Sequence, residues 1–273
     1  MNTLKIFLIG DVVGAAGRAV FAKHIDKIKR THNIDAVILN GENSAHGKGI
    51  TIKNVRFFKN NGVDIITTGN HIWRHKEIYA YLNENADLLR PANFPPGAPG
   101  VGVTTFMVNG HRIAVVNLQG RVFMRELIDC PFQTADAILT YLKDKTNIIF
   151  VDFHAEATSE KMALSFFLDG RVSGVVGTHT HVQTADERIL PGGTAHITDL
   201  GMTGSFNSML GMKKEPIIHT FLTTLPSKFI PDAASPVVLC GAVIEVDTET
   251  GKAVKIERIM VIDNDLSVGH EDD

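Results

Sequence analysis

The sequence predicts an α/β fold with a single core, and three observations support this. From the N-terminus to Thr68, short β-branched runs alternate with amphipathic stretches, which is the rhythm of parallel strands covered by helices on both faces. The apolar fraction of 44% and the charged fraction of 21% are ordinary for a globular protein. No repeat, low-complexity tract or linker interrupts the chain. We therefore expect one domain over residues 1–273.

The first part of the chain supplies the parallel unit. Strands are predicted where β-branched residues cluster, and helices where apolar residues recur at helical spacing. In chain order these are a strand at 4–9, a helix at 19–29, a strand at 36–39, a helix at 55–60 and a strand at 65–68. The proline-rich segment 91–99 is expected to form an ordered loop.

The rest of the chain is predicted to mix strand directions. Asn109-Gly110 separates the runs 103–108 and 112–118, which indicates a hairpin with a tight turn. Further strands are expected at 148–151, 172–176, 187–190 and 195–198. The last two runs, 237–246 and 254–262, flank a turn at 248–251 and predict a long antiparallel hairpin.

Charge and composition exclude several classes of protein. Lys+Arg 27 against Asp+Glu 30 gives a net charge of −3, so the chain lacks the basic field that binds long nucleic acids, while a small phosphorylated ligand remains compatible. Asp11 ends the N-terminal apolar run too early for a signal peptide or membrane span, so we expect a cytoplasmic protein with no membrane partner. Cys130 and Cys240 are expected to be buried free thiols. Exposed strand edges are compatible with a homo-oligomer.

Side chains that can bind metal ions follow the predicted strands, at the point where each strand ends. They are Asp11, Glu42, Asn43, Asn70, His71, His154, His179 and His181. Because the carboxyl ends of parallel strands converge on one crevice, we expect these groups to meet in the folded chain. Glycine precedes the polar group at Gly10, Gly41 and Gly69, which lets an ion or a phosphate approach without a Cβ in the way.

The donor types indicate a pair of ions. Carboxylate and amide oxygens with imidazole nitrogens favour iron, manganese, zinc or cobalt over magnesium or calcium. Of these four metals we expect iron or manganese first. If His179-Thr180-His181 stays extended, its two imidazoles project to the same side and can serve neighbouring ions. Two divalent or mixed-valence ions would outweigh the charges of Asp11 and Glu42, attract a phosphate and lower the pKa of a bridging water. We expect Glu42, on a central strand, to bridge the ions, and the reaction to be hydrolysis of a phosphate ester.

The motifs also resemble those of a known superfamily. Gly10-Asp11-Val12-Val13-Gly14, Gly41-Glu42-Asn43, Gly69-Asn70-His71, His154 and Gly177-Thr178-His179-Thr180-His181 are similar to the ordered motifs of calcineurin-like metallophosphoesterases, and more closely to their YmdB family. The resemblance runs from the N-terminus through the loop Gly201-Met202-Thr203-Gly204. It implies a four-layer sandwich of two mixed β-sheets flanked by helices, a dinuclear site and phosphodiesterase activity on 2′,3′-cyclic nucleotides.

The resemblance further implies a role for each residue. One ion would take Asp11, Glu42, Asn43 and His181, and the other would take Glu42, Asn70, His154 and His179. The wider superfamily has Asp-x-His where this chain has Asp11-Val12-Val13, so Asn43 is expected to replace the missing imidazole. His71 is the candidate general acid, which would protonate the leaving alkoxide and contribute roughly 10²–10⁴-fold in rate.

Simpler interpretations apply to single residues. Asp11 alone is typical of a helix N-cap, His154 of a core histidine and Asn70 of a left-handed turn. The loop His46-Gly47-Lys48-Gly49 lacks the spacing of a P-loop and is predicted to be a mobile rim loop. Gly201–Ser205 is either a turn cluster or, by the resemblance, a lid over the site.

Two other functions compete with phosphodiesterase activity. A dinucleotide-binding oxidoreductase is suggested by Gly10-x-x-x-Gly14-x-x-Gly17, but the glycine spacing is wrong and the histidines His154, His179 and His181 stay unexplained. The other alternative is a catalytically idle regulator that binds a nucleotide at the same site.

Overall fold

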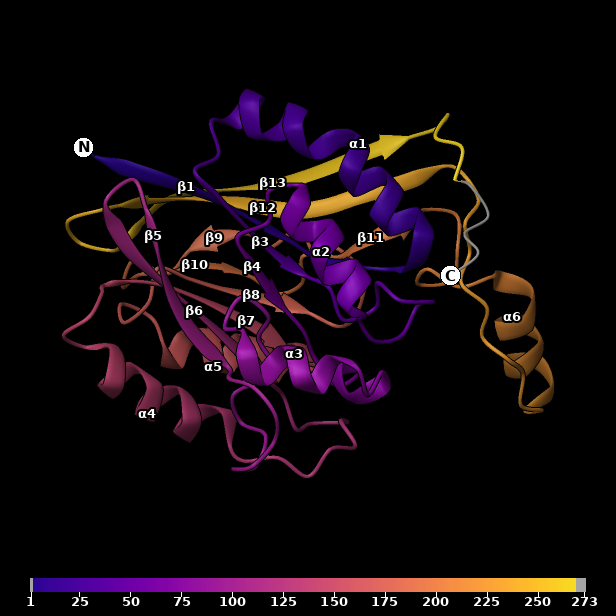
Figure 1. Ribbon diagram of the computed structural model, residues 1–273, viewed down its shortest axis with the longest axis horizontal. Coiled ribbons are helices and arrows are strands. Elements are labelled where there is room, and N and C mark those ends of the chain that lie inside the picture. Colours follow the sequence, from indigo (N-terminus) through magenta and orange to yellow (C-terminus); the bar gives the residue numbers. More distant parts are fainter. Residues whose placement is uncertain (1, 269–273) are drawn as a thin grey trace.

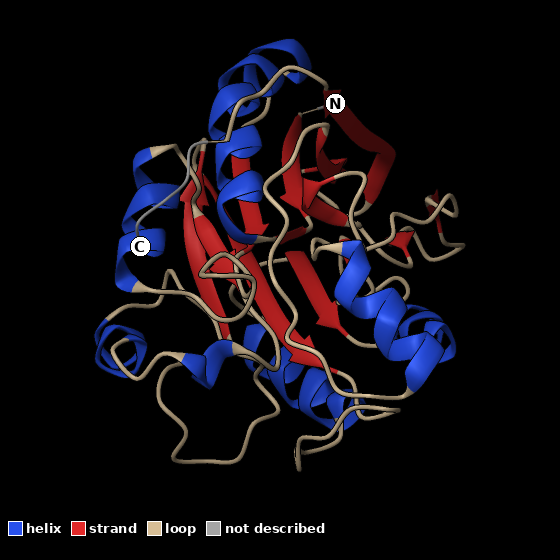
Figure 2. Cartoon of the chain, turned by 90° about the vertical axis from the view of Figure 1, so that its right-hand side faces the viewer, coloured by secondary structure: helices blue, strands red, loops and turns tan. Residues whose placement is uncertain are grey.

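The computed structural model describes residues 2–268 and consists of two β-sheets packed face to face, with helices on their outer faces (Figure 1). Figure 2 shows strands in the middle of the molecule and helices around them. The inner faces of the sheets meet in one buried apolar cluster, which includes Ile6 and Ile38 from one sheet and Val115 and Phe150 from the other. The predicted sandwich of two mixed sheets flanked by helices is confirmed.

The first sheet joins the two ends of the described chain. Its order is β2 (Asp11–Val12), β11 (Met202–Ser205), β12 (Val237–Asp247), β1 (Thr3–Ile9), β3 (Ala36–Asn40) and β4 (Ile65–Thr67), and β13 (Ala253–Asp263) pairs with β12. Strands β1, β3 and β4 are parallel, as predicted. The C-terminal hairpin β12–β13 is also confirmed, and β12 runs antiparallel to β1 with Ile9 opposite Gly241.

The second sheet is parallel at its centre. Its order is β5 (Val103–Val108), β6 (His111–Gln119), β7 (Ile148–His154), β8 (Gly174–Thr178), β10 (Ala195–Ile197) and β9 (Arg188–Ile189). Strands β6, β7, β8 and β10 run parallel, whereas β5 and β9 are antiparallel to their neighbours. The predicted hairpin β5–β6 turns at Asn109 and Gly110, which both have positive φ as such a tight turn requires.

Helices cover both outer faces. Three helices cover the first sheet: α1 (Gly14–His32), α2 (Ile52–Asn60) and α3 (Ile78–Glu84). Two helices cover the second sheet: α4 (Pro131–Leu142) and α5 (Thr158–Phe167). A 3-10 turn, η1 (Ile72–Arg74), precedes α3, and α6 (Lys214–Thr223) lies outside the layers at the right of Figure 1. Only α1 and α2 had been predicted. Within residues 2–268, no helix combines the length and apolarity needed to cross a bilayer.

The glycine-rich segment at 201–205 corrects a sequence-based interpretation. Met202–Ser205 is neither a turn cluster nor a lid, because it forms the fully buried strand β11 between β2 and β12. A Cβ on Gly10 would lie 1.8 Å from the carbonyl oxygen of Gly201, and a Cβ on Gly17 would lie 2.3 Å from that of Thr203. These glycines therefore allow β1 and α1 to pass close to β11, which explains them without a dinucleotide.

Candidate metal centre

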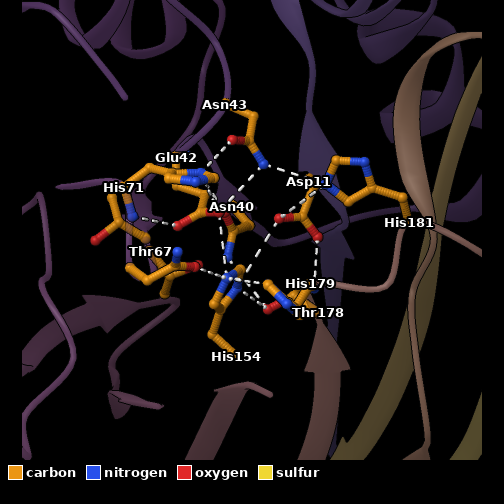
Figure 3. A network of polar contacts seen from close by, with 12 residues as sticks. Asp11, Asn40, Glu42, Asn43, Thr67, His71, His154, Thr178, His179 and His181 are labelled. Atoms are coloured by element: carbon orange, nitrogen blue, oxygen red, sulfur yellow. Dashed lines mark hydrogen bonds and ion pairs between the residues drawn. The ribbon is translucent and has the colours of Figure 1, made fainter. Parts of the chain in front are cut away.

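The polar side chains that follow the strands meet at one place, as the sequence predicts (Figure 3). The first sheet supplies Asp11 from β2, Glu42 and Asn43 after β3, and Asn70 and His71 after β4; the second supplies His154 at the end of β7 and His179 and His181 after β8. Each group lies at or just after the carboxyl end of a strand, Asp11 at the end of β1, where β2 begins. The cluster therefore spans both sheets.

One set of donors surrounds the imidazole of His154. Its Nε2 lies 3.2 Å from Glu42 Oε1, 3.2 Å from Asn70 Oδ1 and 3.0 Å from His179 Nδ1. One ligand atom each of Glu42, His154 and His179 lies within 4.8 Å of the others, so these three residues could hold a metal ion. Nitrogen lone pairs this close repel unless a proton or a cation lies between them. The arrangement therefore fits a cation.

A second set of donors lies around Asp11. Its Oδ1 is 3.9 Å from His181 Nε2, and it is buried without a hydrogen-bond partner, whereas its Oδ2 accepts the backbone N–H of His179 at 3.0 Å. An unpaired buried carboxylate oxygen is costly, and a cation would satisfy it. Asn43 Nδ2 lies 3.1 Å from His181 Nε2. To ligate an ion, Asn43 would have to rotate its amide by half a turn and present its oxygen.

Glu42 lies between the two sets. Its Oε1 is 3.2 Å from both His154 Nε2 and Asn43 Nδ2, and its Oε2 accepts the backbone N–H of His71 at 3.2 Å. The side chain is 1% exposed. It is therefore the carboxylate placed to contact both sets of donors.

The buried charges shift one another's pKa values. Burial alone would raise the pKa of Glu42, but the imidazoles of His154 and His71 outweigh it and hold that pKa well below its usual range. Burial would lower the pKa of His154, but Glu42 and Asp11 outweigh it and raise the pKa to about 9. Burial, and then the charge of His154, lowers the pKa of His179 to about 3. Neutral His179 keeps a lone pair for a cation.

A buried hydrogen-bond network orients His154 through its ring nitrogen Nδ1. Thr178 Oγ1 lies 2.9 Å from His154 Nδ1 and donates to Asp152 Oδ1 at 2.8 Å. Thr67 Oγ1 and Asn40 Nδ2 donate to the other oxygen of Asp152. His154 Nδ1–H can thus donate to Thr178, which leaves Nε2 for the site. Sequence reasoning missed this network, although Asp152 interrupts an apolar strand and could have signalled it.

The segment that carries His179 and His181 is bent, so it does not adopt the extended conformation under which both imidazoles would project to the same side. The two residues have φ values of 100° and 65°, a region that L-residues rarely adopt. Long-range contacts hold this backbone: Asp199 Oδ2 accepts the backbone N–H and the hydroxyl of Thr180, and also the Nζ of buried Lys161 at 2.7 Å. Both imidazoles still reach the cluster, His179 through Nδ1 and His181 through Nε2.

A cavity of about 500 Å³ opens onto the cluster and is lined partly by Glu42, His71 and His181. Gly47 and Lys48 also line it, so the predicted rim loop does lie at the rim. His75 contacts this loop, with Nε2 3.1 Å from the carbonyl oxygen of Lys48. A larger cavity of about 680 Å³ lies elsewhere, between the segment 90–103 and α4, and contains none of the clustered groups.

The two helix-flanked sheets, with a candidate metal site of carboxylates and imidazoles at their strand ends, define a metallophosphoesterase-type protein. Comparison with known proteins narrows this class. The chain belongs to the YmdB-like family, whose sequence pattern matches residues 7–259.

Relatives of known name or structure align over nearly the whole chain. A Bacillus subtilis protein named 2′,3′-cyclic-nucleotide 2′-phosphodiesterase is 51% identical over 263 residues, which cover 96% of this chain and 99% of the relative. The crystal structure of a Mycoplasma pneumoniae protein described as a novel phosphatase matches with a TM-score of 0.91 at 38% identity, covering 97% of this chain and 95% of that one. A Thermus thermophilus structure, described as a hypothetical protein, matches with a TM-score of 0.88 at 40% identity, covering 95% and 99%.

Proposed function

We propose that the protein is a phosphodiesterase whose site holds two metal ions. One ion would take Asp11, Glu42, Asn43 and His181, and the other would take Glu42, Asn70, His154 and His179. The observation that supports this best is the pair of donor sets on either side of Glu42, with Asp11 Oδ1 buried and without a hydrogen-bond partner. The mixed oxygen and nitrogen donors suit iron, manganese, zinc or cobalt, and of these we propose iron or manganese.

Each part of the site has a chemical task. The ions, when bound, lower the pKa of a shared water and neutralise charge on the phosphoryl oxygens. The chain itself supplies a proton donor at His71, whose Nδ1 is 2.8 Å from Asn43 Oδ1 and whose ring lines the cavity. Asn43 contacts Nδ1 with its amide turned either way, accepting from Nδ1–H or donating to Nδ1, so Nε2 is the atom that would protonate the leaving oxygen.

The substrate we propose is a 2′,3′-cyclic nucleotide. The Bacillus subtilis relative carries that activity in its name, and the two chains align over almost their full lengths. A cavity of about 500 Å³ is within the usual range for a small-molecule site, roughly 300–1,000 Å³. We also propose a cytoplasmic protein with one domain over residues 1–273, able to form a homo-oligomer.

Metal content provides the primary test. Elemental analysis of untagged protein should find close to two ions per chain, and Glu42→Gln should lose most of both because Glu42 is shared. One ion per chain, or an unchanged content in Glu42→Gln, would overturn the proposed bridge. Stoichiometry also separates this proposal from a dinucleotide-binding oxidoreductase, which needs no metal.

Turnover of 2′,3′-cyclic nucleotides tests the role of His71. His71→Ala should keep both ions and lose roughly 10²–10⁴-fold in kcat, because only the proton donor is removed. Equal loss of metal would make His71 a ligand instead. A wild-type protein that carries both ions, binds the nucleotide and does not hydrolyse it would be the idle regulator.

A further inference from the structure

The cavity over the metal centre is lined by two chemically different sets of side chains. The polar set includes Glu42, His71 and His181. The other set, here called the apolar wall, is Met209, Leu210, Met212, Ile217, Phe221 and Phe229. It comes from α6 and from the segments on either side of that helix, which the proposed chemistry does not use. Water and a phosphate need no apolar surface, so the wall requires another explanation.

The aromatic members of the wall are open to solvent. Phe221 is 80% exposed and Phe229 is 48% exposed. An isolated exposed apolar residue needs no explanation, but two exposed phenylalanines that line one cavity beside the polar set indicate a ligand surface. Aromatic rings bury a large apolar area when a flat partner covers them.

Hydrogen bonds attach the wall to the metal centre. The Nδ1–H of His181 donates to the carbonyl oxygen of Leu210 at 3.0 Å. The backbone N–H of Lys213 donates to the carbonyl of Ile230 at 2.8 Å, which ties the start of α6 to the segment carrying Phe229. The wall therefore has a defined position relative to the donors that would hold the ions.

We propose that the apolar wall binds the nucleobase of the substrate, with the base stacked on Phe221 and Phe229 while the cyclic phosphate lies at the metal centre. This inference rests on the proposed phosphodiesterase function. It assigns a binding site to the base, the part of the substrate that the metal centre would not contact. A nucleotide has the required combination, an anionic phosphate and a flat base with an apolar face, joined through one ribose. Stacking on aromatic side chains is a general way of holding such a base.

The composition of the wall also predicts the specificity. Its six side chains contain no amide, hydroxyl or charged group, and a thioether is only a weak hydrogen-bond acceptor. Strong discrimination between similar ligands requires polar groups that pair with one ligand and are left unpaired by the other. The wall should therefore accept all four bases, with KM values within about tenfold of one another, because every base has a π-face.

Helix α6 offers a matched control. Ile217 and Phe221, four residues apart, line the cavity, whereas Ile218 and Leu222 form the neighbouring stripe and do not line it. Leu222 is 80% exposed, the same as Phe221. Leu222→Ala thus removes an equally exposed apolar side chain from the same helix without touching the cavity.

The test compares a substrate with and without its base. Steady-state kinetics are measured with 2′,3′-cyclic AMP and with methyl riboside 2′,3′-cyclic phosphate, for the wild type, Phe221→Ala, Phe221→Tyr and Leu222→Ala. Loss of a stacking ring should raise KM for cyclic AMP roughly 5- to 100-fold in Phe221→Ala. The baseless substrate should be unaffected, and Phe221→Tyr and Leu222→Ala should behave as the wild type. Equal effects on both substrates, or none on either, would overturn the base-binding role and leave the phosphodiesterase proposal intact.

Binding provides a readout that does not depend on turnover. Calorimetric titration of chelator-treated protein with adenosine should detect binding in the wild type and Leu222→Ala, and at least fivefold weaker binding in Phe221→Ala. Methyl riboside should not bind to any of them. The alternative is that a second copy of this chain covers the apolar wall. Light scattering, which measures the molecular mass in solution, tests it. A lower mass for Phe221→Ala than for the wild type, with unchanged adenosine binding, would make the wall a subunit interface and refute the proposal.

Discussion

The buried ion pair between Lys161 and Asp199 yields a sharp prediction. The two side chains are 2% and 0% exposed, and their charged atoms are 2.7 Å apart. Lys161→Met keeps most of the volume but leaves the carboxylate without its counter-charge, and breaking a buried pair in this way costs about 3–5 kcal/mol. Asp199 keeps donors from Thr180 and Gly201, so we expect a loss near the lower end, about 3 kcal/mol.

Thermal unfolding in a chelator, followed by circular dichroism, measures this loss without a contribution from bound ions. For a chain of this size it corresponds to a drop in Tm of roughly 6–12 °C. A Lys161→Met variant that melts within about 2 °C of the wild type would refute the reasoning.

Three further predictions concern the site and the core. Thr178→Val removes the hydroxyl between Asp152 and His154, so metal affinity measured by equilibrium dialysis should fall roughly 10–100-fold with little change in the far-UV spectrum. Gly69→Ala places a Cβ 2.3 Å from His154 Nε2 and should abolish metal binding, measured by elemental analysis, in a protein that still folds. Retained metal would mean that the backbone at residue 69 moves to make room for the Cβ. Burial raises the pKa of Cys240 to about 12, so at pH 8 the thiol stays protonated and iodoacetamide should modify it only after denaturation, as peptide mass mapping would reveal.

Much of the fold could be predicted because its strands are locally encoded. Ala36–Asn40 and Ile148–His154 are apolar runs that end in polar groups, and this pattern is visible without knowing their neighbours. Strand β11 could not be predicted, since Met202–Ser205 contains a glycine and becomes a strand only by pairing with β2 and β12. Helix α6 was missed because its apolar residues occupy two adjacent stripes and only Ile217 among them is buried, so no buried face marks it.

The residues that form the site were easier to predict than the residues and backbone conformations that position them. Glu42 and His154 could be found because each comes at the carboxyl end of an apolar strand, β3 in the first sheet and β7 in the second. The bent backbone of His179 and His181 could not, because it depends on hydrogen bonds to Asp11 and Asp199, which are distant in sequence. Asp152 was overlooked for a related reason. It accepts hydrogen bonds from Thr178, Thr67 and Asn40, and only the folded chain brings these residues to it.

Because the donors come from the strands of both sheets and the loops that follow them, any cation they bind ties the two halves of the sandwich together. Such a cross-link exists only in the folded chain, so it stabilises that state by mass action, by about 2.7 kcal/mol at a free concentration one hundred times the Kd. Resistance to heat and to proteolysis should then follow the supply of free metal in the surroundings, even when no substrate is present.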